Sequence, residues 1–337
     1  MTNTNDKFNQ DHLLVSTPPE ILTYQKVRKK VNYNKSLNLL KLKPHEAQQE
    51  IIDIFQEGSF DILTIMCGRR FGKSVIIGGI GATELMIPYA SVLIIAPTTK
   101  NSKILFEEIN KHIRTSGLKV IKRDTKAQHL VLENQAKVTV VSERNIENAL
   151  GDRFSLVLCD ETQSIDDIID LHERKIQPAQ ADFGSTEDGF AFSKTIFIGT
   201  AREFENPIVQ LYDKGQDKRF KEYKSLSYPT RANPFISRDY LAKKEKSLPK
   251  EIWLTEYEAK PTQIKGNMVY YAYEPEINVV KLSSISKNIN ESSQFIAGFD
   301  VGFTDNTAYV LGWVEPFTGN IYIIGEYARS QDVVDNH

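Results

Sequence analysis

The sequence predicts a three-layer α/β domain in which a parallel β-sheet is flanked by helices. Four short runs rich in Ile, Leu and Val have the composition of buried parallel strands. They lie at residues 61–66, 91–96, 155–159 and 195–199. Helical stretches follow the first two runs, at residues 73–86 and 102–116. This alternation of strand and helix is typical of a sheet that packs between layers of helices.

The composition is that of a globular chain and predicts no membrane association. Hydrophobic residues make up 40% and charged residues 26% of the 337 residues, and no apolar run approaches the length that crosses a bilayer. The net charge of -2 gives no whole-chain signal for nucleic acid, so any DNA contact has to come from a local patch. Two cysteines, Cys67 and Cys159, cannot form a disulfide framework and are expected to be small buried residues.

Three further segments accompany the four strands. Residues 1–41 are polar, and they predict a mobile arm or an adaptor segment, with a solvated basic cluster at residues 28–30. Residues 42–56 carry apolar positions at helical spacing, with Pro44 in the first turn of the expected helix. Residues 118–142 alternate with period two, which predicts an inserted antiparallel hairpin.

The C-terminal third predicts a linker subdomain and the beginning of a second domain. Residues 230–262 are polar and helical, with a break at Leu248-Pro249. The second domain begins at Phe295. Its three expected strands lie at residues 295–300, 308–313 and 320–327, with a turn at residues 317–319 between the last two.

Residues 67–74, which read Cys-Gly-Arg-Arg-Phe-Gly-Lys-Ser, predict a phosphate-binding loop between the first strand and the following helix. Gly68 and Gly72 permit the tight turn, and Lys73 can reach the β- and γ-phosphates. Ser74 can hold magnesium. Arg69 and Arg70 add positive charge near the phosphates, and Cys67 replaces the Gly that usually opens the motif. The loop therefore predicts a nucleoside triphosphatase.

An acidic pair at the end of the strand at residues 155–159 supplies the second half of such a site. Asp160 would orient magnesium through its water shell, and Glu161 would activate the attacking water. The alternative is an acidic pair that caps a helix after the strand. Because the loop and the acidic pair occur in this order, together they favour an ATPase-type site.

Two further polar residues are candidates for the same site. Thr200, at the tip of the strand at residues 195–199, can sense the γ-phosphate, although the same tripeptide can be an ordinary turn. Gln48 lies on the lead-in helix, where its amide could read both the donor and the acceptor edges of adenine. Gln49 is chemically equivalent, and a surface Gln is the alternative for either.

These motifs resemble the large terminase subunit of tailed bacteriophages, the motor that pumps DNA into the empty capsid. The similar segments are residues 44–48, 67–74, 160–162, 199–201, 233–236, 256–259 and 266–270, together with Gly298-Phe299-Asp300-Val301-Gly302, Asp305, Thr307 and Ala308. The resemblance extends from about Leu42 to the end of the chain.

The resemblance implies four parts in order: a polar N-terminal arm (1–41), a P-loop ATPase domain of the ASCE type (42–229), a linker subdomain (230–290) and the start of an RNase H-like nuclease domain (291–337). It implies ATP and Mg²⁺ as cofactors of the first active site. The nucleotide-binding residues that it implies are Gln48, Gly68, Arg69, Arg70, Gly72, Lys73 and Ser74, with Ser74 and Asp160 as metal ligands, Glu161 as general base and Thr200 as coupling residue.

The chain departs from the family pattern in two ways: at Leu150, and in the nuclease acids expected after Asp300. The family carries an Arg just before the Gly that precedes the second ATPase motif, where this chain has Leu150, so Arg144 or Arg153 is expected to serve as the trans-acting finger. Asp300 would be the first nuclease carboxylate and would help to hold paired Mg²⁺ or Mn²⁺ ions. The family's remaining nuclease acids lie on later strands, so we expect either a truncated chain or a defective nuclease.

The implied partners are double-stranded DNA, a portal protein and a small terminase subunit, with no membrane. The chain is expected to be a monomer alone, to form a homo-oligomeric ring when assembled, and to act in the host cytoplasm while docked on the procapsid. Two other functions fit the same motifs: a helicase-like DNA translocase, and an assembly or DNA-binding protein with a degenerate ATPase site. Intact Lys73, Ser74, Asp160 and Glu161 argue against the degenerate site.

Overall fold

The computed structural model describes residues 17–124, 128–149, 151–186, 189–262, 275–300 and 306–330 of the 337-residue chain. The chain divides into two compact units, Met1–Ile264 and Lys265–His337. Each unit is described by itself. The division at residue 264 falls within the range 230–290 that the sequence assigns to a linker, and the outer boundaries of that linker stay a prediction.

The first unit contains an eight-stranded sheet with the strand order β3-β4-β5-β2-β6-β7-β1-β8. The strands are β1 Ile62–Cys67, β2 Ser91–Ala96, β3 Val120–Asp124, β4 His129–Leu132, β5 Lys137–Ser142, β6 Leu156–Cys159, β7 Lys194–Gly199 and β8 Tyr223–Tyr228. The six strands from β5 to β8 in this order pair in parallel. This arrangement confirms the predicted parallel sheet and its four central strands.

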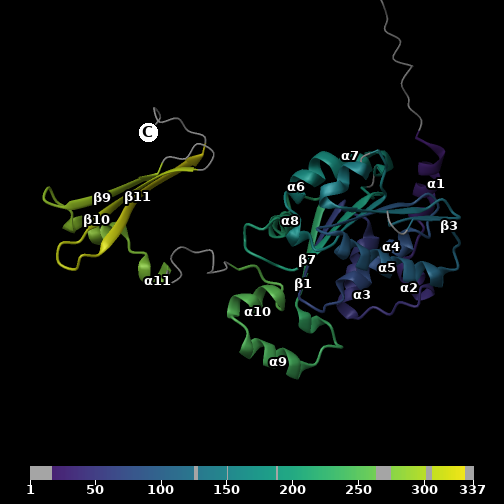
Figure 1. The fold of residues 1–337 in the computed structure, drawn as a ribbon, viewed down its shortest axis with the longest axis horizontal. Helices are drawn as coiled ribbons and strands as arrows, with labels where there is room; N and C mark the ends of the chain where they lie inside the picture. Colours follow the sequence, from purple (N-terminus) through teal and green to yellow (C-terminus); the bar gives the residue numbers. More distant parts are fainter. Residues whose placement is uncertain are drawn as a thin grey trace, which may run out of the picture. The chain divides into compact units, whose positions relative to one another are not determined.

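Helices cover both faces of this sheet, with α3, α4 and α5 on one side and α6, α7 and α8 on the other (Figure 1). Their bounds are α3 Glu46–Glu57, α4 Lys73–Glu84, α5 Thr99–Ser116, α6 Ile168–Leu171, α7 Gln177–Gln180 and α8 Pro207–Gln216. The helix α3 starts after its N-cap His45, so Pro44 precedes the helix instead of lying in its first turn.

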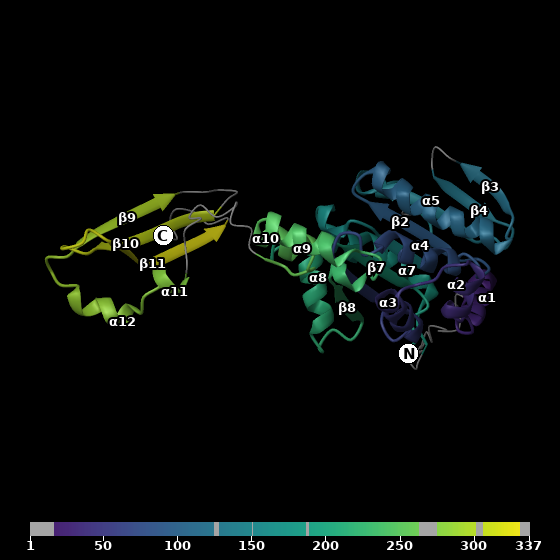
Figure 2. The ribbon, with the colours of Figure 1, turned by 90° about the horizontal axis from the view of Figure 1, so that it is seen from below.

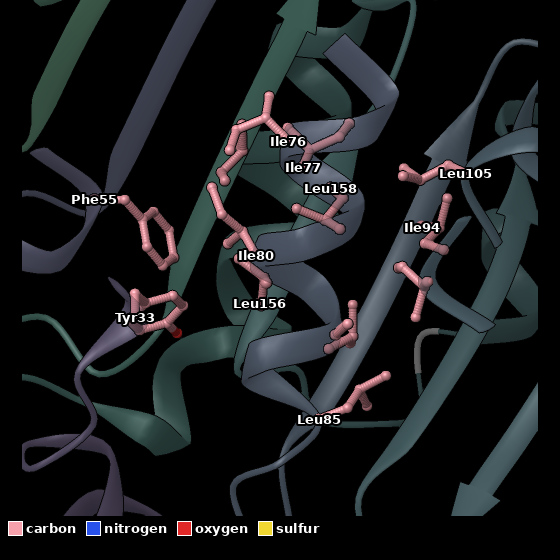
Figure 3. Packing of buried hydrophobic residues seen from close by; sticks show 14 of the residues in the cluster. Tyr33, Phe55, Ile76, Ile77, Ile80, Leu85, Ile94, Leu105, Leu156 and Leu158 are labelled. Carbon is pink, nitrogen blue, oxygen red and sulfur yellow. The ribbon is translucent and has the colours of Figure 1, made fainter. Parts of the chain in front are cut away.

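The two layers exist because each central strand is buried at every position and consists mostly of apolar residues. In β6, Leu156 and Leu158 face one hydrophobic cluster, whereas Val157 and Cys159 face the other. Successive side chains of a strand point to opposite faces, so a strand that is apolar at every position needs a helix layer on each side. Figure 3 shows Ile76, Ile77 and Ile80 of α4 lying against the first of these faces.

The antiparallel pairing predicted for residues 118–142 is confirmed, but the segment is not a separate insertion. The segment forms three strands that extend the main sheet, because β5 pairs in parallel with β2 while β3 and β4 add antiparallel at the edge (Figure 2). The period-two pattern has a physical origin in β4, where Leu130 and Leu132 are buried and the alternate residues are only half-buried. The period-two pattern therefore predicted the antiparallel pairing of these strands, but it did not predict that β5 pairs with β2.

The prediction of a mobile arm over residues 1–41 is wrong for the part that the structure describes. Two helices, α1 Pro19–Arg28 and α2 Tyr33–Leu39, pack on the core. Arg28, expected in a solvated basic cluster, is only 2% exposed and lies 3.4 Å from Glu84 of α4. Glu84 also accepts hydrogen bonds from Tyr24 and Tyr33, at 2.5 and 2.6 Å.

Two short helices of the first unit follow β8 in the chain. These are α9 Arg238–Ser247 and α10 Lys250–Glu256, separated by Leu248-Pro249 as the sequence predicts. No side chain of α9 is buried, whereas α10 ends on the buried residues Thr255 and Glu256. The end of α10 is therefore the part of this segment that is fixed against the sheet.

The second unit contains the three strands that the sequence predicts. They are β9 Gln294–Asp300, β10 Asn306–Val314 and β11 Ile321–Ser330, in the antiparallel order β11-β10-β9. The short helices α11 Pro275–Asn278 and α12 Leu282–Ile285 precede them. Trp313 is fully buried and stacks on Tyr322. Three antiparallel strands do not by themselves define an RNase H-like domain, which stays a prediction.

Candidate functional site

The phosphate loop lies between the end of β1 at Cys67 and the first residue of α4, Lys73. Arg70 and Gly72 have positive φ angles, 63° and 98°, so the backbone turns sharply before the helix begins. Gly72 is the N-cap of α4, which leaves the helix N-terminus and its amides available to an anion. Cys67 is fully buried, and burial raises the pKa of its thiol, which makes it a packing residue.

Three of the predicted site residues converge beside this loop. The Lys73 ammonium donates a hydrogen bond to the Thr200 hydroxyl at 3.1 Å and lies 3.4 Å from a carboxylate oxygen of Glu161. The three residues follow β1, β7 and β6, which are neighbours in the parallel sheet, so their ends meet at one edge. The carboxyl edge of such a sheet is where α/β proteins bind ligands.

Glu161 is oriented by a residue that the sequence did not single out. The side-chain amide nitrogen of Gln163 donates to the second Glu161 oxygen at 2.5 Å, and the side-chain amide oxygen of Gln163 accepts from the Thr200 backbone amide at 3.1 Å. Burial alone would raise the pKa of Glu161, but the charge of Lys73 and the hydrogen bond from Gln163 outweigh it and lower this pKa. Glu161 is therefore ionised and fixed in direction. The sequence offered one signal for this role, namely that Gln163 is a polar residue two positions after Glu161.

Asp160, a candidate metal ligand, is a buried carboxylate whose pKa is raised. The residue is only 4% exposed, and burial together with the nearby Glu161 charge raises the pKa of its carboxyl to about 6. One carboxylate oxygen accepts a hydrogen bond from the Glu161 amide. A raised pKa means that the buried carboxylate lacks sufficient counter-charge, which a cation held with Ser74 would supply. A carboxylate and a hydroxyl are oxygen ligands of the kind that magnesium prefers, and the binding of the ion by Asp160 and Ser74 stays a prediction.

Gln48 braces the loop from the helix α3. Its amide nitrogen donates to the Gly72 carbonyl at 3.2 Å, and its amide oxygen accepts from the His45 backbone amide. The imidazole of His45 contacts the Phe71 carbonyl at 3.2 Å. Both ends of the Gln48 side chain are thus engaged, and contact with adenine stays a prediction. Gln49 instead donates to Asn34 and Asp53, away from the loop.

The loop is also held by the chain around β8 and α10. Gly68 donates from its amide to the Tyr228 carbonyl at 2.9 Å, and the Arg69 amide donates to the Glu256 carbonyl at 2.6 Å. The Thr230 hydroxyl donates to the Arg69 carbonyl at 2.8 Å. The amides of Gly68 and Arg69 and the carbonyl of Arg69 are therefore all engaged by the surrounding protein.

Arg70, the next residue of the loop, is held by a similar hydrogen bond, and a cleft lies beside it. Asn233 donates to the Arg70 carbonyl at 2.7 Å. The same Asn233 lines a cleft of about 890 Å³ whose wall also contains Glu46 and Trp253. This volume falls within the usual range for a small-molecule site of about 300–1,000 Å³. The cleft thus offers room beside the loop for a ligand larger than a phosphate group.

Gly68 is required at its position by these contacts. A methyl group added there would lie 2.5 Å from the Tyr257 carbonyl and 2.6 Å from the Thr230 amide, both of which are backbone atoms. We expect Gly68→Ala to lower the free energy of unfolding by about 1–3 kcal/mol, as overpacking usually does. Urea denaturation would measure the loss. Gly151→Ala is the matched control, because nothing lies within 4 Å of its added methyl group; equal stability losses in the two variants would contradict the expectation.

The two arginines predicted as fingers lie elsewhere in the first unit. Arg153 pairs with Asp182, and half of its side chain is exposed. Arg144 is exposed in the 3-10 turn Glu143–Ala149. Their role stays a prediction. Asp300 is the last residue of β9 in the second unit, and within the described ranges no group of three or more His, Cys, Asp or Glu side chains could hold a metal ion.

A family model matches the part of the chain that carries this site. Residues 64–234, just over half of the chain, match the model described as RNA cytidine acetyltransferase NAT10/TcmA, helicase domain. The chain belongs to this helicase-domain family. In this NAT10/TcmA helicase-domain member, the matched range contains Lys73, Asp160, Glu161 and Thr200.

This member of the NAT10/TcmA helicase-domain family is also similar to phage packaging proteins, which confirms the predicted resemblance. The large terminase subunit of Escherichia phage T5 is 24% identical over 296 residues, which cover 87% of this chain and 65% of that protein. The chain therefore spans less than two thirds of the length of this curated relative.

Solved structures confirm the predicted P-loop ATPase fold of this helicase-domain member. The large terminase ATPase domain of Thermus phage P74-26 is 18% identical, with a TM-score of 0.53 over 68% of this chain and 98% of that one. The large terminase of the thermophilic bacteriophage D6E, in complex with ADP, is 12% identical, with a TM-score of 0.51 over 87% of this chain and 72% of that one.

None of the described helices is long and apolar enough to cross a bilayer.

Proposed function

We propose that the chain is the ATP-hydrolysing subunit of a DNA-packaging motor, a large terminase, which moves double-stranded DNA into a viral procapsid. The observation that carries this proposal is the convergence of Lys73, Glu161 and Thr200 at the carboxyl edge of the sheet. The similarity to the T5 large terminase over 87% of the chain supports packaging as the purpose of the hydrolysis.

In the proposed reaction a water oxygen bonds to the γ-phosphorus while the bond from that phosphorus to the β–γ bridging oxygen breaks. Glu161 accepts the water proton, since its lowered pKa keeps it ionised and Gln163 fixes its direction. Lys73 offsets negative charge on the β- and γ-phosphates, and ADP and inorganic phosphate leave. Magnesium held by Ser74 and Asp160 would neutralise the phosphate charge further.

Thr200 is the proposed coupling residue. Its hydroxyl accepts a hydrogen bond from Lys73 and its amide is tied to Gln163, which in turn holds Glu161. When a γ-phosphate attracts Lys73, the hydrogen bond to Thr200 has to change. The end of β7 would thereby respond to the state of the nucleotide.

A helicase-like translocase is the second candidate function. It is favoured by the family match, because the matching model describes a helicase domain. That match ends at residue 234, whereas the T5 alignment covers 296 residues and therefore reaches well outside it. The wider similarity favours packaging. The remaining parts of the proposal, namely a portal protein, a small terminase subunit, assembly as a ring, action in the host cytoplasm and a nuclease in which Asp300 holds metal, depend on the same relationship.

The two candidates predict different DNA products. In the presence of ATP, procapsids and linear double-stranded DNA, we expect the chain to make DNA resistant to added nuclease, and we expect Lys73→Ala to abolish this protection together with ATP hydrolysis. Strand separation of a forked duplex without any protected DNA would favour the helicase instead. A Lys73→Ala variant that hydrolyses ATP at the wild-type rate would contradict the proposed site itself.

A further inference from the structure

Two arginines and one glutamate form a cluster beside the phosphate loop. Glu256, at the end of α10, uses both carboxylate oxygens: one pairs with Arg69 of the loop, and the other pairs with Arg202. The glutamate side chain is only 10% exposed, whereas the side chains of Arg69 and Arg202 are 61% and 29% exposed. The carboxylate is thus buried beneath two guanidinium groups that reach solvent.

Arg202 lies close to the reacting end of the proposed site. It follows Thr200, the residue that contacts Lys73, by two positions. Arg202 also shares the Glu256 carboxylate with Arg69 of the loop. Both guanidinium groups therefore lie beside the phosphate loop, where ATP is expected to bind.

The glutamate is fixed by its backbone. The Glu256 carbonyl accepts from the Arg69 amide, and the Thr262 amide donates to the Arg202 carbonyl at 3.2 Å. Ala259, three residues beyond Glu256, is buried in a small cluster with Met66 and Ala201. Because the chain is held on both sides of the carboxylate, Glu256 can hold two guanidinium groups in place without itself moving.

We propose that Arg202 contacts the γ-phosphate of bound ATP from within the same chain, and that Glu256 is the positioning residue that holds Arg202 and Arg69 beside the loop. This inference rests on the proposed ATPase function. A guanidinium presents several donors in a planar fork, so it can keep one edge on a carboxylate while another edge binds a phosphate oxygen. An arginine supplied in cis in this way stabilises the charge that develops during phosphoryl transfer.

The cluster gives a different source for the arginine from the one the family resemblance implies. Arg144 and Arg153 were expected to act on a neighbouring subunit, and Arg153 is paired with Asp182. Arg202 needs no neighbour, because its own chain holds it beside the phosphate loop through Glu256. A simple structural ion pair is the competing explanation, since a buried carboxylate between two cations would also fasten α10 to the loop.

Steady-state kinetics with ATP and equilibrium binding of ATP and ADP separate these explanations. We expect Arg202→Ala to lower kcat by about 100-fold, the usual effect of removing one donor to a developing oxyanion, with ADP affinity changed less than twofold. Arg202→Lys keeps the charge and should not restore kcat, because it loses the fork. Glu256→Gln should lower kcat without weakening ATP binding, since it removes a carboxylate that competes with phosphate.

The matched control is Glu251→Gln, the same change in the first turn of the same helix, which should leave kcat and the affinity for ATP unchanged. Mixing Arg202→Ala chains with Lys73→Ala chains tests the cis assignment: no recovery of hydrolysis supports it, whereas recovery would show that the arginine acts in trans and overturn it. An unchanged kcat in folded Arg202→Ala and Glu256→Gln variants would also overturn it. If the wild-type chain hydrolyses no ATP, the proposed function fails as well.

Discussion

Glu161→Gln is expected to lower kcat for ATP hydrolysis by about 10²- to 10⁴-fold, the usual loss when a general base is removed. The amide keeps the shape of the side chain but cannot accept the water proton. Binding of ATP should persist, because Lys73 and the amides at the N-terminus of α4 are unchanged. Single-turnover hydrolysis of radiolabelled ATP, with binding measured separately, would establish the two quantities.

Glu173→Gln is a suitable control for this change, since Glu173 is an exposed carboxylate that pairs with Lys214. It should hydrolyse ATP like the wild type. If Glu161→Gln retained the wild-type kcat, Glu161 would not be the base. If it lost ATP binding as well as hydrolysis, its main role would be to position Lys73, which it contacts at 3.4 Å.

Arg28→Ala is expected to lower the free energy of unfolding by about 3–5 kcal/mol, because removing one partner of a buried ion pair leaves an uncompensated charge. The charge left behind is Glu84, which is 1% exposed and would keep the hydrogen bonds from Tyr24 and Tyr33 without its guanidinium partner. Arg28 also lies over the rings of Tyr33 and Phe55, so its loss removes packing. Urea denaturation would measure the change.

Arg174→Ala is the matched control for Arg28→Ala. Arg174 also pairs with a carboxylate, Asp170, but both side chains are more than half exposed. Exposed pairs contribute little, so we expect a change within about 0.5 kcal/mol. A destabilisation by Arg28→Ala no larger than that of Arg174→Ala would show that the buried cluster does not hold α1 and α2 on the core.

The sequence predicted the centre of the fold because the central strands carry their own signal. In β2 and β6 every residue is buried, so continuous apolar runs mark them. The edge strand β8 was missed, because its sequence Tyr-Lys-Ser-Leu-Ser-Tyr is half polar and only two of its six residues are buried. A strand at the edge of a sheet can carry more polar residues than a central strand, because fewer of its side chains are buried. The sequence alone does not show which strand lies at the edge.

The site was predictable where chemistry and spacing fall within one short segment. The segment at residues 67–74 and the pair Asp160-Glu161 could be recognised in this way, and the structure brings Lys73 and Glu161 together. Arg202 and Glu256 are 54 residues apart in the chain, and neither belongs to a compact motif of the ATPase site. Arg28 was misjudged for the same reason, since its partner Glu84 lies far along the sequence and only one face of the polar helix α1 is buried.

The buried contact between α1 and α4 also determines where a self-sufficient ATPase domain can begin. The helix α4 starts at the phosphate loop with Lys73 and ends at Glu84, which spans about 18 Å at 1.5 Å per residue. Cutting the protein at Leu42, the boundary that sequence alone suggests, would strip the counter-ion and both tyrosine donors from Glu84 and expose the apolar surface beneath α1 and α2. A soluble, crystallisable fragment should therefore start upstream of Pro19. Peptide tags placed there would leave the C-terminal end of α4, at Glu84, intact.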